Sequence, residues 1–320
     1  MHKAIALYSG GLDSLLSILI VKRQGFDVIA LRFLTGFVSP LKERDIIYAK
    51  KFDFEIREID IREKFIKILK KPKYGYGKNL NPCIDCKILM LKEAKEKLLE
   101  FNASFIVTGE VISQRPMSQK KEFLTLIEKE ANLQGLILRP LSAKLLPPTK
   151  PELEGIINRE LLYDIWGRTR KPQLALAKKF GIEIIPQPAG GCLLTDPSFC
   201  KKVNDLIKHN QLTIENIEML KIGRHFRISE KCKAIVGRDE AENEILLSKY
   251  QGTFIYPADR KGPVVFLVGD FSQQEIYTAT EICSYYSKRN NLEVIIKINE
   301  EEIRKVFGAI SDDRIVKYRI

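Results

Sequence analysis

The sequence has 320 residues, 45% of them hydrophobic and 29% charged, which is ordinary for a soluble globular protein of two domains. No apolar run reaches the roughly 18–20 residues of a membrane helix, so we expect a cytoplasmic protein without a membrane partner. The net charge of +12 is concentrated in residues 1–200, with 33 Lys and Arg against 23 Asp and Glu. This excess fits a polyanionic partner such as nucleic acid, or a solvated Lys/Glu-rich surface.

The first predicted element is a short strand over residues 4–7, and an apolar, helix-patterned run follows over 15–21. Between them lies the sequence Ser9-Gly10-Gly11-Leu12-Asp13-Ser14. Two glycines leave room for a ligand, and the amides at a helix start favour a phosphate. The serines add hydroxyl groups, and Asp13 can hold Mg²⁺ or orient the turn. The alternative is an ordinary, well-capped strand–helix turn.

Strands are predicted over residues 27–33 and 55–61, with a helix over 40–51 between them. Strands that alternate with helices predict a doubly wound parallel sheet, whose ligand lies beyond the carboxyl ends of the strands. Further strands are predicted over 104–109 and 136–141, and helices over 87–101, 152–162 and 172–180.

Residues 62–80 contain Arg62 and six lysines against one acid, with Tyr74 and Tyr76 among them. This mixture favours contact with RNA, although a solvent-facing helix followed by a loop would also produce it. The sequence Pro82-Cys83-Ile84-Asp85-Cys86 follows at a predicted helix start, a pattern typical of metal or redox sites. Residues 166–172 form a second basic cluster around the only tryptophan. Cys192 stands in a double-glycine turn, the usual setting of a ligand or reactive thiol.

The pattern changes near residue 205. Helices are predicted over 205–220, 240–250 and 271–287, and strands over 223–228, 233–238, 253–256, 264–268 and 293–298. We therefore expect an α/β domain over residues 1–200 and a smaller α+β domain over residues 205–320.

The motifs SGGLDS, NPCIDC and GGC together resemble those of the PP-loop ATP pyrophosphatases, and specifically of the tRNA thiolases that make 2-thiouridine or 4-thiouridine. The resemblance implies an ATP-dependent sulfur transfer that adenylates a uridine carbonyl and releases pyrophosphate. It implies that ATP is bound by Ser9, Gly10, Gly11, Asp13 and Ser14 with Mg²⁺, and that Asp13, Cys83 and Cys192 are catalytic.

In the iron–sulfur branch of these thiolases, three cysteines bind a [4Fe–4S] cluster whose fourth iron holds a hydrosulfide. Carried over to this chain, the ligands are Cys83, Cys86 and Cys192. In a persulfide mechanism, Cys192 would carry the sulfur and Cys83 would resolve it. Three cysteines favour the cluster, because the persulfide route needs only two.

Five further residues are candidates near the nucleotide. Arg32 and Phe33 could frame the adenine or simply pack at a strand end. Thr108, Gly109 and Glu110 are expected at the rim of the sheet where ATP phosphates or the base would bind. The C-terminal sequences GRHFRIS and AIVGRDEAEN resemble the small RNA-binding domain of the NFACT family. The implied partners are tRNA and a sulfur donor, either free sulfide or a carrier protein, and a homodimer is possible.

The remaining candidates have simpler interpretations. Cys232 and Cys283 are expected to be core thiols, as is Cys200, which is also a fallback ligand. His225 is expected to face RNA or to be a satisfied histidine. Two other functions stay open: a PP-loop ligase or amidotransferase for a small molecule, and a non-catalytic RNA-binding protein with a structural metal.

Overall fold

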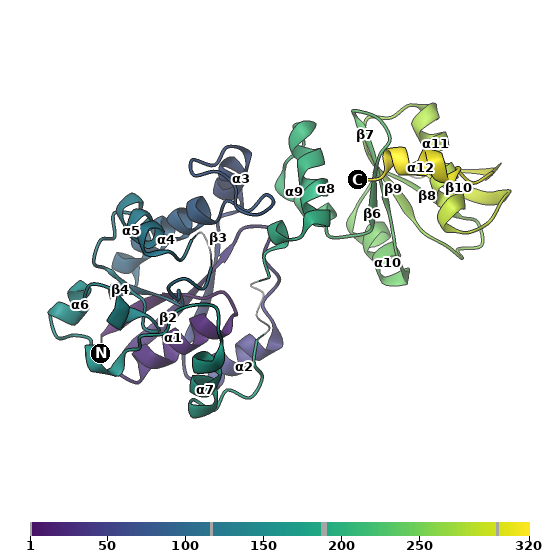
Figure 1. Cartoon of the computed structure of the whole chain (residues 1–320). Coiled ribbons are helices and arrows are strands. Elements are labelled where there is room, and N and C mark those ends of the chain that lie inside the picture. The colour runs from purple at the N-terminus through teal and green to yellow at the C-terminus, as the bar shows by residue number, and fades with distance from the viewer. Residues whose placement is uncertain (1, 116–117, 187–190, 299–300) are drawn as a thin grey trace. The chain divides into compact units, whose positions relative to one another are not determined.

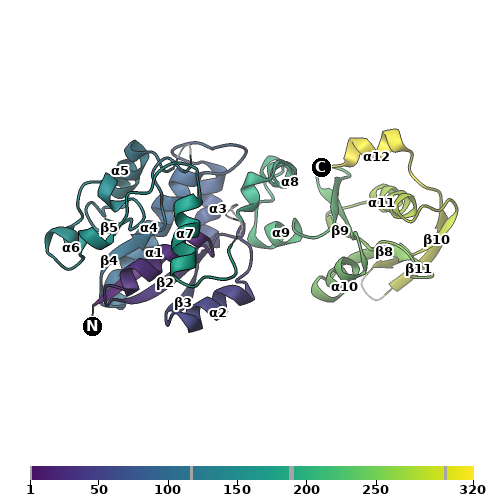
Figure 2. The ribbon, with the colours of Figure 1, turned by 60° about the horizontal axis from the view of Figure 1, so that its bottom comes forward.

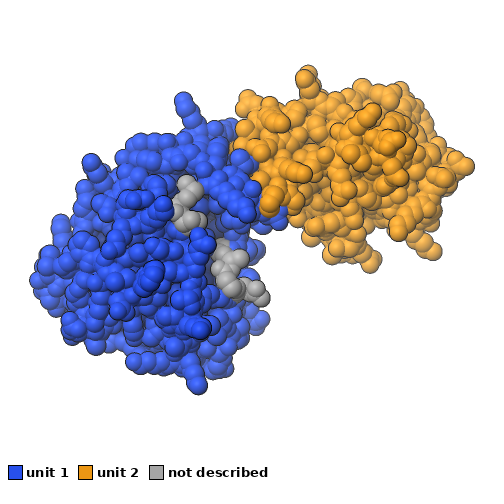
Figure 3. Space-filling model, in the orientation of Figure 1, with its two compact units in different colours: residues 1–196 blue, residues 197–320 orange. Residues whose placement is uncertain are grey.

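The computed structural model describes residues 2–115, 118–186, 191–298 and 301–320. The chain divides into two compact units, residues 1–196 and 197–320 (Figure 3). The division falls just before the predicted boundary at 200–205, since the helix that begins at Pro197 belongs to the second unit. Among the described residues, no helix combines the length and apolar character that crossing a membrane requires.

Unit 1 is built on a five-stranded sheet in the order β3-β2-β1-β4-β5, with every neighbouring pair parallel (Figure 1). The strands are β1 (Lys3–Leu7), β2 (Asp27–Leu34), β3 (Glu55–Asp60), β4 (Ala103–Thr108) and β5 (Ile137–Leu138). The predicted doubly wound parallel sheet is confirmed. The carboxyl ends of β1, β2 and β4 therefore lie at one edge of the sheet.

Helices cover both faces of this sheet. On one face, α1 (Leu12–Lys22) and α7 (Lys171–Lys179) lie side by side (Figure 2) and share a core with alternate strand residues such as Ala4, Ala6 and Val28. Side chains alternate between the faces of a strand, so Ile5 and Ile106 point to the other face. There α4 (Cys83–Glu100) packs with α3 (Arg62–Lys70) and α5 (Lys121–Glu130). Helix α2 (Glu43–Lys51) contributes Tyr48 to the first core.

Several predicted elements of unit 1 differ in the structure. The strand predicted over 136–141 is only two residues long, and α5 was not predicted. The helix predicted over 152–162 is wrong, because that segment holds the end of α6 (Lys150–Leu153) and a separate 3-10 turn (Arg159–Leu161). Gly155, with a φ of +69°, interrupts it, since a left-handed residue ends a helix.

Unit 2 contains a six-stranded antiparallel sheet in the order β11-β10-β8-β9-β7-β6. One face packs against α11 (Gln273–Tyr286) and α12 (Asp312–Tyr318), and the other against α10 (Glu240–Lys249). The strands are β6 (Arg224–Arg227), β7 (Cys232–Val236), β8 (Thr253–Pro257), β9 (Val265–Gly269), β10 (Leu292–Ile298) and β11 (Glu301–Phe307). The predicted α+β class is confirmed. The single helix predicted over 205–220 is instead two, α8 (Pro197–Lys208) and α9 (Ile214–Met219), and β11 and α12 were not predicted.

Candidate active site

The loop between β1 and α1 folds back on itself through its two serines. Ser14 Oγ donates to the Gly11 carbonyl at 2.8 Å and accepts from the Ser9 amide at 3.3 Å. Gly10 has a φ of +71°, which glycine adopts without steric cost. Gly11 is the N-cap of α1, so the unpaired first amides of that helix lie next to the loop. The loop thus offers hydroxyl and amide donors to an anion, as a phosphate site requires.

A cation reaches the same loop from α2. Arg44 Nη2 donates to the Gly10 carbonyl at 3.1 Å, and its side chain is only 18% exposed. The neighbouring Asp45 is buried and accepts from the Tyr8 hydroxyl at 2.8 Å and the Lys42 amide at 3.0 Å. Burial and the Asp45 charge raise the pKa of Tyr8, so Tyr8 remains a protonated donor. This arrangement holds a guanidinium beside the loop, and no sequence motif predicted it.

Asp13, in the first turn of α1, has one carboxylate oxygen paired and, among the residues that the structure describes, one without a hydrogen-bond partner. Gln114 Nε2 donates to Oδ2 at 3.1 Å, while the buried Oδ1 accepts no hydrogen bond from the described residues. Burial raises the pKa of Asp13, and the Gln114 hydrogen bond and the charges of Arg170 and Arg115 oppose that rise. An unpaired buried oxygen calls for a partner, which a cation or a bound water would supply.

The end of β4 approaches α1 so closely that only glycine fits. A Cβ on Gly109 would lie 2.5 Å from the Ser14 nitrogen and 2.6 Å from the Asp13 carbonyl carbon. Thr108, which precedes it, pairs with Leu7 of β1 and donates its hydroxyl to Glu110 at 3.0 Å. Thr108 and Gly109 therefore lie at the same edge of the sheet as the SGGLDS loop, packed against its helix.

Glu110 connects this edge to α4. It is 6% exposed and pairs with Lys87 and, at 2.9 Å, with Arg139 Nε. Burial alone would raise the pKa of Glu110, but the charges of Lys87 and Arg139 outweigh it and lower that pKa to about 2. Since Lys87 follows Cys86 directly, this buried ion pair ties the start of α4 to the end of β4.

Cys83 and Cys86 occupy the first turn of α4, and Asp85 between them anchors the preceding loop. The Asp85 carboxylate accepts from the Lys73 and Tyr74 amides at 2.9 and 3.0 Å. Burial raises the pKa of Cys83, against the charges of Lys87 and Arg115. Burial, followed by the charges of Cys192 and Cys83, raises the pKa of Cys86. The electrostatic effect of Cys192 on Cys86 means that the third thiol lies in the neighbourhood of the pair.

Cys192 reaches that neighbourhood through backbone pairing just beyond β2. It forms an antiparallel bridge with Val38, and the Leu193 amide donates to the Phe37 carbonyl at 2.9 Å. After the following 3-10 turn (Leu193–Thr195), the Thr195 carbonyl accepts from Asn79 Nδ2 at 3.0 Å, which joins this turn to the loop before Cys83. Residues 188–190 of the predicted turn lie outside the described residues.

The thiols and the SGGLDS loop share one charged neighbour. The charge of Arg115 opposes the rise in pKa that burial causes at both Asp13 and Cys83. Within the described part of the chain, no three His, Cys, Asp or Glu side chains are grouped so that they could hold a metal ion. The cysteines are therefore neighbours at this edge of the sheet without forming a closed ligand set.

Other candidates lie in structural surroundings. Arg32 is 6% exposed and pairs with Glu58 and the Ser39 carbonyl, and Phe33 is buried in β2. Cys200, Cys232 and Cys283 are buried, whereas Cys83, Cys86 and Cys192 are partly exposed. His225 is a buried core histidine, with Nε2 at 2.8 Å from the Ile222 carbonyl, while its Nδ1 has no hydrogen-bond partner among the described residues.

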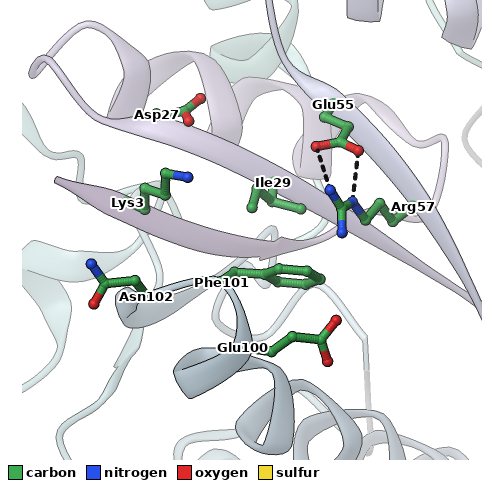
Figure 4. A pocket seen from close by; sticks show the side chains of 8 residues that line it. All are labelled: Lys3, Asp27, Ile29, Glu55, Arg57, Glu100, Phe101 and Asn102. Atoms are coloured by element: carbon green, nitrogen blue, oxygen red, sulfur yellow. Dashed lines mark hydrogen bonds and ion pairs between the residues drawn. The ribbon is translucent and has the colours of Figure 1, made fainter. Parts of the chain in front are cut away.

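A cavity of about 450 Å³ lies at the opposite edge of the sheet (Figure 4). Its lining includes Lys3, Asp27 and Glu55, which begin β1, β2 and β3. Arg57 there pairs with Glu55 and lies over the Phe101 ring, 4.6 Å from its centroid. Because ligands of doubly wound sheets bind at the carboxyl ends of the strands, this cavity is separate from the candidate site.

Sequence comparisons assign both domains. Residues 1–144 match the family model described as thiamine biosynthesis protein (ThiI), and residues 223–319 match the NFACT protein RNA binding domain. Cys83 and Cys86 lie inside the first match, whereas Trp166 and Cys192 lie outside both.

Individual relatives are similar over parts of the chain. A probable tRNA sulfurtransferase of Thermococcus kodakarensis is 30% identical over 146 residues, which cover 43% of this chain and 36% of that protein. A tRNA-specific 2-thiouridylase of Caldanaerobacter subterraneus is 25% identical over 99% of this chain and 87% of its own length. A 4-thiouridine synthetase solved with RNA and ATP is 19% identical, covering 68% of this chain and 53% of its own, with a TM-score of 0.39.

The chain thus spans about a third of the length of the sulfurtransferase that it matches. The two family matches confirm the PP-loop and NFACT-like domains expected from the sequence. The chain therefore joins a domain of the ThiI family, over residues 1–144, to an NFACT-type RNA-binding domain, over residues 223–319.

Proposed function

We propose that the protein is an ATP-dependent tRNA sulfurtransferase that adenylates a uridine carbonyl and replaces its oxygen with sulfur. The observation that carries the proposal is that Cys192, more than a hundred residues further along the sequence, lies in the neighbourhood of the Cys83–Cys86 pair, at the edge of the sheet that holds the SGGLDS loop. A nucleotide loop alone would serve any PP-loop enzyme, but its combination with thiols points to sulfur transfer.

The adenylation half rests on the loop and its cations. A uracil oxygen leaves poorly, so ATP must first convert it to an adenylate. The departing pyrophosphate would be bound by the α1 amides and by Ser9 and Ser14, with Arg44 and Arg170 offsetting its charge. Asp13 would hold Mg²⁺ through the unpaired Oδ1, since carboxylate oxygens are ligands that this ion prefers.

For the sulfur half, Cys83, Cys86 and Cys192 have the ligand chemistry of an iron–sulfur group and would hold it, since thiolates are the usual ligands of such clusters. When bound, a [4Fe–4S] cluster with three protein ligands would supply one open iron for a hydrosulfide. In the alternative, Cys192 carries a terminal sulfur as a persulfide. The terminal sulfur comes from a persulfide-bearing carrier protein. It attacks the adenylated carbon and AMP leaves, so that the uridine is joined to Cys192 through an S–S bond. The Cys83 thiolate then attacks Cys192 Sγ, that S–S bond breaks to release the thiouridine, and an external thiol reduces the Cys83–Cys192 disulfide.

RNA binding rests on the NFACT match and on the basic segment before Cys83, which consists of α3 and the loop after it. Arg62 and Lys64 in α3 and Lys73 in the loop pair with carboxylates, and Tyr76 in the loop is 38% exposed. Asp85 and Asn79 fix this loop beside the thiols. RNA bound to the loop would therefore lie close to the sulfur-carrying residues. The sulfur donor and a homodimer remain predictions.

The test is a complete reaction under anaerobic conditions with the full chain, ATP, sulfide and tRNA. We expect pyrophosphate release that depends on tRNA, and a thiouridine detected by mass spectrometry of the nucleosides. Serine at Cys83, Cys86 or Cys192 should abolish thiolation while ATP still binds, and alanine at Cys200 should not. A cluster would appear as brown protein whose iron is lost in the same three variants.

Other outcomes identify the rival functions. Pyrophosphate release that survives RNase would indicate a ligase for a small molecule. Stoichiometric zinc without pyrophosphate release in the presence of RNA would indicate an RNA-binding protein with a structural metal.

A further inference from the structure

The segment around the only tryptophan presents that side chain to solvent on a fixed backbone. Trp166 is 68% exposed, whereas Ile165 before it is buried. The Ile165 amide donates to the Leu141 carbonyl and the Gly167 amide to the Ile112 carbonyl, both at 2.8 Å. These bonds hold the backbone on both sides of Trp166, so the indole is presented by a rigid support.

This support is part of the candidate active site. Ile112, whose backbone bridges to Trp166, lies two residues before Gln114, the donor to Asp13. Arg170, four residues after Trp166, donates to the Pro186 carbonyl at 3.1 Å, and its charge lowers the pKa of Asp13. The tryptophan segment is thus linked to Asp13 in two ways, through the Ile112–Gln114 backbone and through the charge of Arg170.

The surroundings of Trp166 are cationic. Arg168 is exposed, Arg170 is partly exposed, and Arg115 stands exposed on the neighbouring loop. Single exposed apolar residues are common and need no explanation. An exposed indole among arginines at the edge of a nucleotide site is different, because a planar π surface with cations beside it binds a base and its phosphate together.

We propose that Trp166 is a stacking platform for an unpaired base of the RNA substrate next to the target uridine, with Arg168 binding the adjacent phosphate. The inference rests on the proposed function and adds the requirement for an unpaired base at this position. Trp166 acts as a positioning residue, because it holds the RNA strand while Asp13 and the loop handle ATP.

The fluorescence of Trp166 can be used to detect its contact with RNA. Because the sequence contains one tryptophan, selective excitation of indole fluorescence in the full chain reads only residue 166. Adding tRNA, or a short single-stranded oligouridine, should quench this emission with saturation. Replacing Trp166 by alanine should weaken RNA binding roughly 5- to 150-fold, the range for loss of one base–aromatic stack. Trp166→Phe should recover part of the affinity.

Three controls decide between stacking and simpler effects. Heparin carries negative charge without bases, so quenching by heparin equal to that by RNA would overturn stacking. Saturable quenching by ATP alone, with none added by RNA, would mean that the indole contacts the nucleotide instead. Leu99→Ala, at a 93% exposed site beyond the other edge of the sheet, should leave RNA affinity unchanged.

Arg168→Gln should reduce the salt dependence of RNA binding by about one counterion without removing the quenching. Failure of the two proposals would look different. Saturable, base-dependent quenching without thiouridine would support the platform and defeat the sulfurtransferase. Normal thiolation and normal RNA affinity in Trp166→Ala would support the sulfurtransferase and defeat the stacking platform.

Discussion

Replacing Gly109 with alanine tests whether the approach of β4 to α1 sets the nucleotide loop. The new Cβ would stand 2.5 Å from the Ser14 nitrogen and 2.7 Å from its Cα, both backbone atoms that cannot rotate away. Reaching ordinary contact requires the strand end and the helix start to separate by about 1 Å, because close-packed interiors have little slack.

The separation has a cost in stability and a cost in activity. Overpacking of this kind costs about 1–3 kcal/mol. For a unit of this size, that corresponds to a fall of roughly 2–12 °C in its unfolding temperature. A displacement of about 1 Å in a catalytic group slows reaction roughly a hundredfold. We therefore expect tRNA-dependent pyrophosphate release to fall far more than the loss of folded protein explains.

The assay combines calorimetry of the full chain with the initial rate of pyrophosphate release at a temperature where the variant is folded. Gly308→Ala is the matched control, since a Cβ there would meet no atom within 4 Å. A Gly109→Ala protein with the wild-type rate and unfolding temperature would refute the reasoning.

Three further predictions follow from buried groups. Since the pKa of Glu110 falls from 4.5 to about 2, its ionisation contributes about 3 kcal/mol that is lost as pH falls from 4.5 to 2. In urea unfolding, Glu110→Gln should lose this acid-sensitive part of the free energy of unfolding, and its free energy of unfolding at pH 7 should be lower than that of the wild type. A pH dependence of stability identical to that of the wild type would contradict the assignment. Asp85→Ala removes the acceptor of two loop amides, so thiolation should fall at least tenfold. ATP affinity, measured by calorimetry, should stay constant. Equal loss of thiolation and ATP affinity would argue against a role confined to the loop and the thiol pair. Burial lowers the pKa of Lys233 from 10.5 to about 7, so wild-type stability rises with pH across that window. Lys233→Met should stabilise unit 2 most at pH 7 and below, and a gain that does not shrink towards pH 10.5 in thermal scans would contradict the cause.

The regular part of the fold was predictable because burial leaves a pattern in the sequence. Strands β1 and β2 are continuous apolar runs, and their alternation with helices indicated the parallel sheet. Strand β11 left no such pattern, since nearly all of its residues are exposed and it is held by pairing with β10. The predicted helix over 152–162 is interrupted at Gly155 by a left-handed backbone conformation. The spacing of apolar residues carries no information about that conformation.

The candidate site divides in the same way. The motifs SGGLDS and CxxC could be recognised in the sequence because the residues of each motif lie within a single turn or helix start, and their spacing is therefore fixed. Arg44 and Arg139 were not identified as parts of the site, because their roles depend on partners brought together by the folded sheet. Arg32, at a strand end, suggested a nucleotide contact, but its guanidinium pairs with Glu58.

The contact of Asp85 with the amides of Lys73 and Tyr74 has a consequence for protein engineering and for divergence. The thiol pair and the loop before it are joined through one carboxylate, whose residue lies between the two cysteines in the sequence. They should therefore be transplanted between homologues as a single cassette from residue 71 to residue 87. In a chimera that exchanges only the loop, the Asp85 carboxylate would face a loop backbone with different amide positions. Both cysteines would then be misplaced.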